Sequence, residues 1–169
     1  MQHAKQNTMN TPITVEQLSK ALIENPWNCN SIAVFLLFDQ YCKQRPTPDA
    51  IPVLRQALHS SYHGTVRCAA HSLKKLGPVA SEAMDDLLLA AAHVDVAGMP
   101  QAYPQCIAAM IAIEPHHPEL LPLIRSFMDL DNWGPISASM KALKYIGTPQ
   151  SEELLQHMAI LWLPKLNKM

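Results

Sequence analysis

Histidine is the side chain of this sequence best suited to hold a metal ion or to transfer a proton near neutral pH. The chain has eight histidines, and His59 and His63 stand four residues apart, a spacing that places two imidazoles on one helical face. The serines between them and the glycine after them favour a turn, which would separate the two rings. His116 and His117 are adjacent and lie between prolines, so their side chains point apart. We therefore predict no metal site and no cofactor.

Nucleophilic side chains likewise lack the neighbours that catalysis requires. The sequence contains no nucleophile elbow, no cysteine–histidine signature and no phosphate-binding loop. Its four cysteines form no CxxC pair, and Cys68 and Cys106 lie in apolar helical stretches, where a thiol behaves as a small hydrophobic side chain. Free thiols are typical of a reducing compartment, so we expect a cytoplasmic protein. We expect no catalytic residue.

Composition narrows the class of protein further. Of the 169 residues, 49% are apolar and 16% are charged, which indicates a globular domain rather than a disordered chain. The formal net charge of −1 gives no overall bias toward nucleic acid. No apolar run is long enough for a membrane span, and residues 1–10 lack the apolar segment of a secretory signal. We expect neither a membrane nor a nucleic-acid partner.

Charged residues are divided unequally between alternate predicted helices. The helices expected near 65–76, 103–113 and 135–146 carry no acid, and their bases are Arg67, Lys74, Lys75, Lys141 and Lys144. The helices expected near 81–93, 119–130 and 151–163 carry acids and a single base, Arg125. One face of the folded chain would then be basic and the other acidic. The alternative is that Arg67 bonds to a neighbouring unit and that the lysines only improve solubility.

The outward positions of the basic helices carry apolar side chains as well. These positions follow the i, i+4, i+7 spacing of one helical face. They include Arg67, His71, Lys74, Lys141 and Lys144, and also Phe35, Phe38 and Ile111. Exposed apolar area of this kind marks a partner site. Alternatively, the two phenylalanines belong to the core or lie beneath the N-terminal tail.

An internal repeat must position these residues. The stretch 51–77 recurs 70 residues later without a gap, so that Pro52 matches Pro122 and Gly77 matches Gly147. Each unit reads as two helices joined by a turn, and no alternation of period two indicates a strand. The sequence therefore predicts an all-α fold of nine helices, near residues 14–24, 32–42, 50–58, 65–76, 81–93, 103–113, 119–130, 135–146 and 151–163.

Local signals set the expected helix ends and the expected core. Thr14 with Gln17 three residues later is a candidate N-cap pair, and Asp49 is expected to cap the third helix. Gly77 and Gly147 are expected to end their helices with positive φ, which glycine adopts without steric cost. Recurrence at equivalent repeat positions predicts six buried side chains: Leu54, Leu58, Leu73, Leu87, Ile124 and Leu143.

The segments 52–58 and 65–77 read PVLRQAL and TVRCAAHSLKKLG. They resemble the bacterial HEAT-like repeat, whose first helix carries a proline and paired leucines and whose second carries Val-Arg, two alanines, a leucine and a closing glycine. The match is good over 50–92 and weaker over 103–114, where Tyr103 and Pro104 replace Val-Arg. The resemblance implies a right-handed α-solenoid, an armadillo-like helical stack, of about four and a half units. It places a flexible tail at 1–12 and a single repeat domain at 13–169.

The resemblance favours a non-catalytic protein-interaction scaffold that binds an acidic protein partner on its second helices. Turns beside those helices hold Tyr62 and Trp133, aromatic types that are enriched at interface hot spots. The expected contact residues are Phe35, Phe38, Tyr62, Arg67, His71, Lys74, Ile111, Trp133, Lys141 and Lys144. An adaptor and an immunity protein that blocks a toxin both fit this reading. HEAT-like relatives supply an alternative, either a bilin-lyase-type enzyme or a DNA-glycosylase-type protein, although the latter needs a more basic groove.

Overall fold

A computed structural model describes residues 12–24, 32–93, 102–128 and 133–166, and within these residues the chain is helical with no strand. The helices are α1 (Val15–Glu24), α2 (Ile32–Cys42), α3 (Ile51–Leu58), α4 (His63–Leu76), α5 (Met84–Ala92), α6 (Tyr103–Ile113), α7 (Leu120–Ser126), α8 (Trp133–Ile146) and α9 (Pro149–Leu166). Short 3-10 helices occupy Pro48–Ala50 and Gly77–Ala83. The predicted all-α class is confirmed for this part of the chain, and the expected tail lies almost wholly outside it.

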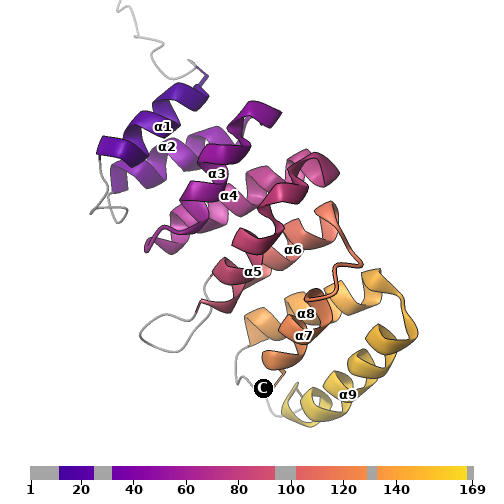
Figure 1. Cartoon of the computed structure of the whole chain (residues 1–169). Coiled ribbons are helices and arrows are strands. Elements are labelled where there is room, and N and C mark those ends of the chain that lie inside the picture. The colour runs from indigo at the N-terminus through magenta and orange to yellow at the C-terminus, as the bar shows by residue number, and fades with distance from the viewer. Residues whose placement is uncertain (1–11, 25–31, 94–101, 129–132, 167–169) are drawn as a thin grey trace, which may run out of the picture.

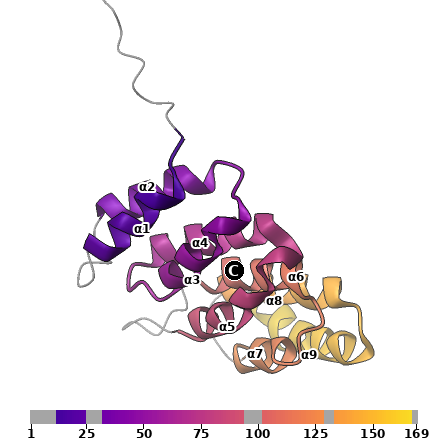
Figure 2. The ribbon, with the colours of Figure 1, turned by 45° about the horizontal axis from the view of Figure 1, so that its top comes forward.

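Consecutive helices pack together in pairs, α1 with α2, α3 with α4 and α5 with α6, and these pairs follow one another in chain order (Figure 1). The even-numbered helices contact one another in sequence, α2 against α4, α4 against α6 and α6 against α8. The odd-numbered helices α1, α3, α5 and α7 do the same, and α9 packs against α8 at the end of the series. The turned view in Figure 2 gives a second view of this series of helices. The chain therefore has an even-numbered layer and an odd-numbered layer.

Side-chain caps begin two of the helices. The Thr14 backbone N–H donates to Gln17 Oε1 at 2.9 Å, and the Gln17 N–H donates to Thr14 Oγ1 at 3.2 Å, which is the reciprocal capping box that the sequence predicts. Thr148 and Ser151 form an equivalent pair at the start of α9. The predicted cap at Asp49 is wrong. Asp49 lies inside the short 3-10 helix that precedes α3, and the N-cap position of α3 is the next residue, Ala50, which makes no side-chain cap.

Glycine ends α4 and α8 as predicted. Gly77 has φ of +62° and Gly147 has φ of +64°, values that L-residues with side chains rarely adopt. After Gly77 the chain runs through the 3-10 helix Gly77–Ala83, so α5 begins at Met84 rather than near residue 81. The helix α7 ends at Ser126 rather than near residue 130, and the next residue, Phe127, turns inward against the ring of Tyr103 at a centroid distance of 4.3 Å.

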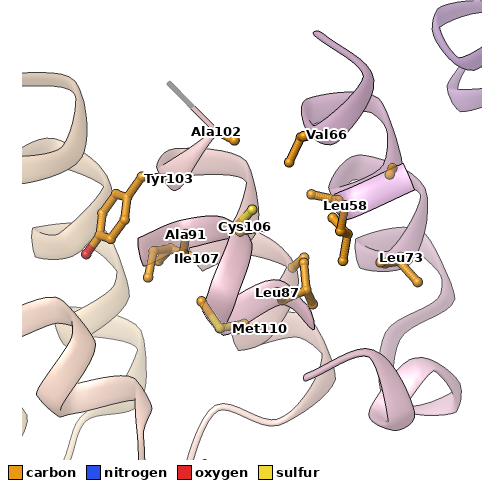
Figure 3. Close-up of a cluster of buried hydrophobic side chains, with 14 of the residues drawn as sticks. Leu58, Val66, Leu73, Leu87, Ala91, Ala102, Tyr103, Cys106, Ile107 and Met110 are labelled. Carbon is orange, nitrogen blue, oxygen red and sulfur yellow. The ribbon is translucent and has the colours of Figure 1, made fainter. Parts of the chain in front are cut away.

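The core runs between the two layers. All six side chains predicted to be buried are buried: Leu54, Leu58, Leu73, Leu87, Ile124 and Leu143. Figure 3 shows Leu73, Leu87 and Met110 from successive helices within one such cluster. At the C-terminal end, the buried Trp162 of α9 donates its indole N–H to the carbonyl oxygen of Met128 at 3.4 Å. This bond ties α9 to the end of the odd-numbered layer.

Candidate functional site

A groove of about 510 Å³ lies along the even-numbered layer, across α4, α6 and α8. The residues that line it are Lys74, Pro104, Ile107, Ala108, Ile111, Ala112, Gly134, Ser137, Ala138, Lys141, Ala142 and Tyr145. This set is defined here as the lysine groove. Its helices are the second members of their pairs, where the outward-facing positions were predicted to bind a partner.

Small side chains explain why this surface is hollow. Alanine occupies positions 108 and 112 of α6 and positions 138 and 142 of α8, so short side chains meet where these two helices pack together. Ile111 is half-buried beside them and adds branched apolar area. Beneath the floor, the Tyr103 hydroxyl shares a buried hydrogen bond of 2.7 Å with Ser139 Oγ, which fixes α6 against α8. The resulting floor is apolar, and its helices are held together from below.

Positive charge borders the floor on both sides. Lys74 comes from α4 and Lys141 from α8, and both side chains are exposed. Neither lysine forms an ion pair or hydrogen bond with any residue that the structure describes. No Asp or Glu occurs within α4, α6 or α8. A ligand with negative charge would therefore meet no competing acid on these three helices.

The odd-numbered layer handles its charges differently. Arg55 of α3 donates from Nε to Asp86 Oδ2 at 2.6 Å and from Nη1 to Glu82 at 3.2 Å. His59 Nε2 lies 2.7 Å from Asp86 Oδ1. Burial raises the pKa of Asp86, but hydrogen bonds from Arg55 and His59 outweigh it and hold that pKa below its usual 3.8. Charges on this side are thus used within the fold, whereas those beside the lysine groove are not.

The other basic residues that were predicted as contacts lie on the same helices but outside the groove lining. Arg67, His71 and Lys144 are all exposed. Arg67 forms no ion pair or hydrogen bond with the described residues, so the alternative that it bonds to a neighbouring unit finds no support there. Partial burial lowers the pKa of His71, and the nearby charges of Lys75 and Lys74 lower it further. The imidazole is therefore neutral near pH 7 and adds no charge to this face.

The predicted contact role of Phe38 is wrong. Its side chain is only 1% exposed, because the inner face of α2, which also carries Val34 and Tyr41, packs against the rest of the fold. The side chains that α2 exposes instead are Ile32 and Leu36. The apolar residues of α2 show no clear helical period, so the sequence could not indicate which face of this helix is buried.

Phe35 and Tyr62 are not free surface anchors either. Their rings meet edge to face with centroids 5.3 Å apart, and both side chains are half-buried. A Cβ atom at Gly64 would lie 2.6 Å from the Tyr62 ring and 2.7 Å from the Phe35 ring. These three residues form a close contact that joins α2 to the first turn of α4. Phe35 and Tyr62 therefore have a packing role in the fold, and their expected role in partner binding stays a prediction.

Of the predicted contacts, the groove contains Lys74, Ile111 and Lys141. Trp133 is the first residue of α8, and its side chain lies outside what the structure describes. The sequence analysis missed Tyr145, which lines the groove and is 68% exposed. Its position could have been found, because it lies four residues after Lys141 on the same helical face.

The histidine pair behaves as the sequence indicates. His59 caps the end of α3 and His63 opens α4, so a turn separates them. Both line a second hollow of about 390 Å³ together with His93. Among the described residues, these histidines do not form a group whose nitrogen atoms could share one metal ion.

Comparisons with protein-family models, with curated proteins and with solved structures found no significant match. Among the residues that the structure describes, no helix combines the length and the apolar character that crossing a membrane requires.

Proposed function

We propose that this chain is a non-catalytic scaffold that binds a protein partner in the lysine groove. One observation carries the proposal, namely an apolar floor bordered on both sides by lysines that have no described acidic partner. Apolar floors supply binding free energy by removing apolar surface from water, and rim charges steer association. The floor remains open to solvent, and Lys74 and Lys141 form no ion pair within the described chain, so both features are available to a partner.

The proposed architecture is a right-handed α-solenoid of HEAT-like repeats, about four and a half units long. The layered contacts of even-numbered and odd-numbered helices support it, because a solenoid unit contacts mainly the units before and after it. In such a stack the second helices line an extended surface. The groove lies across three of them, so it spans parts of three consecutive units.

The groove defines the chemistry of the partner. An apolar side chain of the partner would fill the space above the alanines, and acidic side chains on either side of it would reach Lys74 and Lys141. Tyr145 would cover the anchor, as exposed aromatic side chains do at interface hot spots. The partner segment is therefore acidic, with a central leucine or phenylalanine. An adaptor and an immunity protein both remain consistent with this chemistry.

A designed peptide tests the proposal without knowledge of the natural partner. The probe peptide carries one central phenylalanine between glutamates, and its comparators replace the phenylalanine by glycine or the glutamates by lysines. We expect only the probe peptide to raise the fluorescence anisotropy of its label on titration, with weaker binding at high salt. Amide chemical shifts should change in α4, α6 and α8. Shifts confined to other helices, or equal binding of all three peptides, would contradict the proposal.

A duplex DNA titration separates the nucleic-acid class from the protein-binding class. Filter binding should be weak, because the few cations of this face can neutralise only a few phosphates. Tight binding that falls steeply with salt would favour a glycosylase-type function and would count against the scaffold.

A further inference from the structure

A cluster of metal-binding side chains lies between α2 and α4, away from the lysine groove. Asp39 and Cys42 stand three residues apart on α2, which places them on one face of that helix. Cys68 approaches from α4. One ligand atom from each of the three lies within 4.8 Å of the others, and no other such group occurs among the described residues.

Contacts around the cluster hold its two helices in place. The Lys75 ammonium of α4 donates to the carbonyl oxygens of Cys42 at 2.6 Å and Gln44 at 3.2 Å, so it fixes the end of α2 against α4. The Cys42 thiol donates to the carbonyl oxygen of Asp39 at 3.2 Å. Cys68 is buried, with its Sγ beside that of Cys42. The three groups are therefore brought together by the fold and not by chance rotation of exposed side chains.

The donor set and its spacing suit a thiophilic cation. Two sulfurs that each lie about 2.3 Å from a tetrahedral zinc ion are about 3.8 Å apart, so a small contraction of the cluster would complete the site. Sulfur donors favour zinc and softer ions over magnesium or calcium. Lys43 binds Asp39 Oδ2 at 2.7 Å, but a carboxylate has a second oxygen that can act as a ligand.

We propose that Asp39, Cys42 and Cys68 bind one thiophilic divalent cation, such as Zn²⁺, which joins α2 to α4. Three protein ligands leave a fourth tetrahedral position for water. Binding releases the thiol protons, and Lys43 and Arg67 offset part of the negative charge of the ligands. No spacing motif indicates the site, because the two cysteines lie 26 positions apart along the chain. This inference is independent of the partner proposed for the groove.

Cadmium is the direct probe, because cadmium–thiolate bonds absorb in the ultraviolet. The full chain, reduced with a reagent that does not chelate metals, is titrated with Cd²⁺ while the charge-transfer absorption is recorded. We expect one equivalent to saturate the signal in the wild-type protein and in the control Cys106→Ser, since Cys106 is a buried cysteine of α6 outside the cluster. The variant Cys42→Ser should lose the signal.

Two further measurements keep the test independent of folding defects. Zn²⁺ should raise the midpoint of thermal unfolding of the wild type and of Cys106→Ser, but not that of Cys42→Ser. The partly exposed Asp39→Asn variant keeps both thiols, and its affinity for Cd²⁺ should fall by at least about tenfold, the smallest loss typical of even an outer-shell change. No Cd²⁺ absorption in the wild type, full absorption in Cys42→Ser, or unchanged affinity in Asp39→Asn would overturn the assignment.

Discussion

Alanine at four positions of α6 and α8 determines the depth of the lysine groove, because each methyl group leaves space that a larger side chain would fill. Methyl-sized side chains also let the two helices approach closely, while Tyr103 and Ser139 bond beneath them. The same residues are unremarkable in sequence, since alanine is common in helices of every kind. Their role is visible only when the neighbouring helix is in place.

Filling the groove should abolish its proposed binding. Ala108 is half-exposed, so Ala108→Phe projects a ring into the groove with little disturbance of the core. We expect the affinity for the probe peptide to fall at least about tenfold, which corresponds to about 1.4 kcal/mol. The control is Ala92→Phe at the exposed end of α5, and fluorescence anisotropy measures both. Equal affinities for the two variants would place the binding site elsewhere.

Charge reversal at the rim should act on the rate of association. The variant Lys74→Glu with Lys141→Glu places acids where the probe peptide carries acids, and rim charges act mainly through steering. We expect a slower association rate, with the difference from wild type larger at low salt than at high salt. Stopped-flow fluorescence measures it, and Lys20→Glu on α1 is the control, since Lys20 lies outside the groove. A change confined to the dissociation rate would mean that the lysines act as buried contacts.

At the scale of elements, a single residue can determine where a helix ends, and the backbone conformation of that residue can be predicted from its type. Gly77 and Gly147 both end helices with positive φ, as the repeat predicts. The sequence does not predict the 3-10 helix that follows Gly77. In so short a segment, 3-10 and α-helical turns have the same residue preferences. The predicted cap at Asp49 and the predicted helix start near residue 81 both failed, and both positions lie within such a turn.

Substitution of Gly77 tests its backbone role. A Cβ atom there would meet only the Ala112 carbonyl oxygen at 3.7 Å, an ordinary contact, so the cost arises from φ and not from crowding. We expect Gly77→Ala to lower the free energy of unfolding by about 1 kcal/mol, measured by urea denaturation. Gly134→Ala is the control, because Gly134 lies inside α8 and has no positive φ. Gly134→Ala should cause no such loss, because alanine is a better helix former than glycine. An unchanged or raised stability of Gly77→Ala would show that the positive φ does not govern position 77.

Sequence alone predicted the helices and the core better than it predicted the site. The helical spacing of leucines such as Leu73 and Leu143 identifies the buried face of each helix, and both side chains are buried. On α2, apolar residues surround the whole helix, so the sequence could not tell the buried Phe38 from the exposed Leu36. A groove depends on which side chains of different helices face each other. The hydrophobic periodicity of a single helix does not contain that information.

At the scale of the whole molecule, the charged side chains of the two layers have different roles. Arg55, Glu82 and Asp86 connect α3 to the start of the next unit, and His59 joins them from the end of α3. Acids and bases of the odd-numbered layer thereby hold neighbouring units together. In the even-numbered layer, Lys75 bonds to the end of α2, whereas Lys74 and Lys141 of the lysine groove form no ion pair or hydrogen bond with the described residues and are available for a partner.

The ion pairs around Asp86 in the odd-numbered layer should make the free energy of unfolding depend on pH in the acid range. The pKa of Asp86 is lower in the folded protein than its ordinary 3.8, so its ionisation stabilises the fold fully above pH 3.8. That contribution is lost as the pH falls below 3.8 through the folded pKa, because the unfolded chain then binds the proton first. We expect Asp86→Asn to flatten this part of the pH profile of unfolding free energy. Asp85→Asn, at an exposed carboxylate with no described ion pair, should leave the slope unchanged.

The stacking of each helix on its near neighbours also governs how the chain reaches and leaves its folded state. The main contacts join helices that are adjacent or one apart in order, so folding needs to close only short loops. Such local topology favours fast folding and lets the ends open while the middle stays intact. We expect amide hydrogens of α1, which contacts only α2 and α3 appreciably, to exchange with solvent sooner than those of α6. Uniform exchange rates would instead indicate that the whole domain unfolds as one cooperative unit. In that case a partner bound to α4, α6 and α8 would slow exchange in every helix equally.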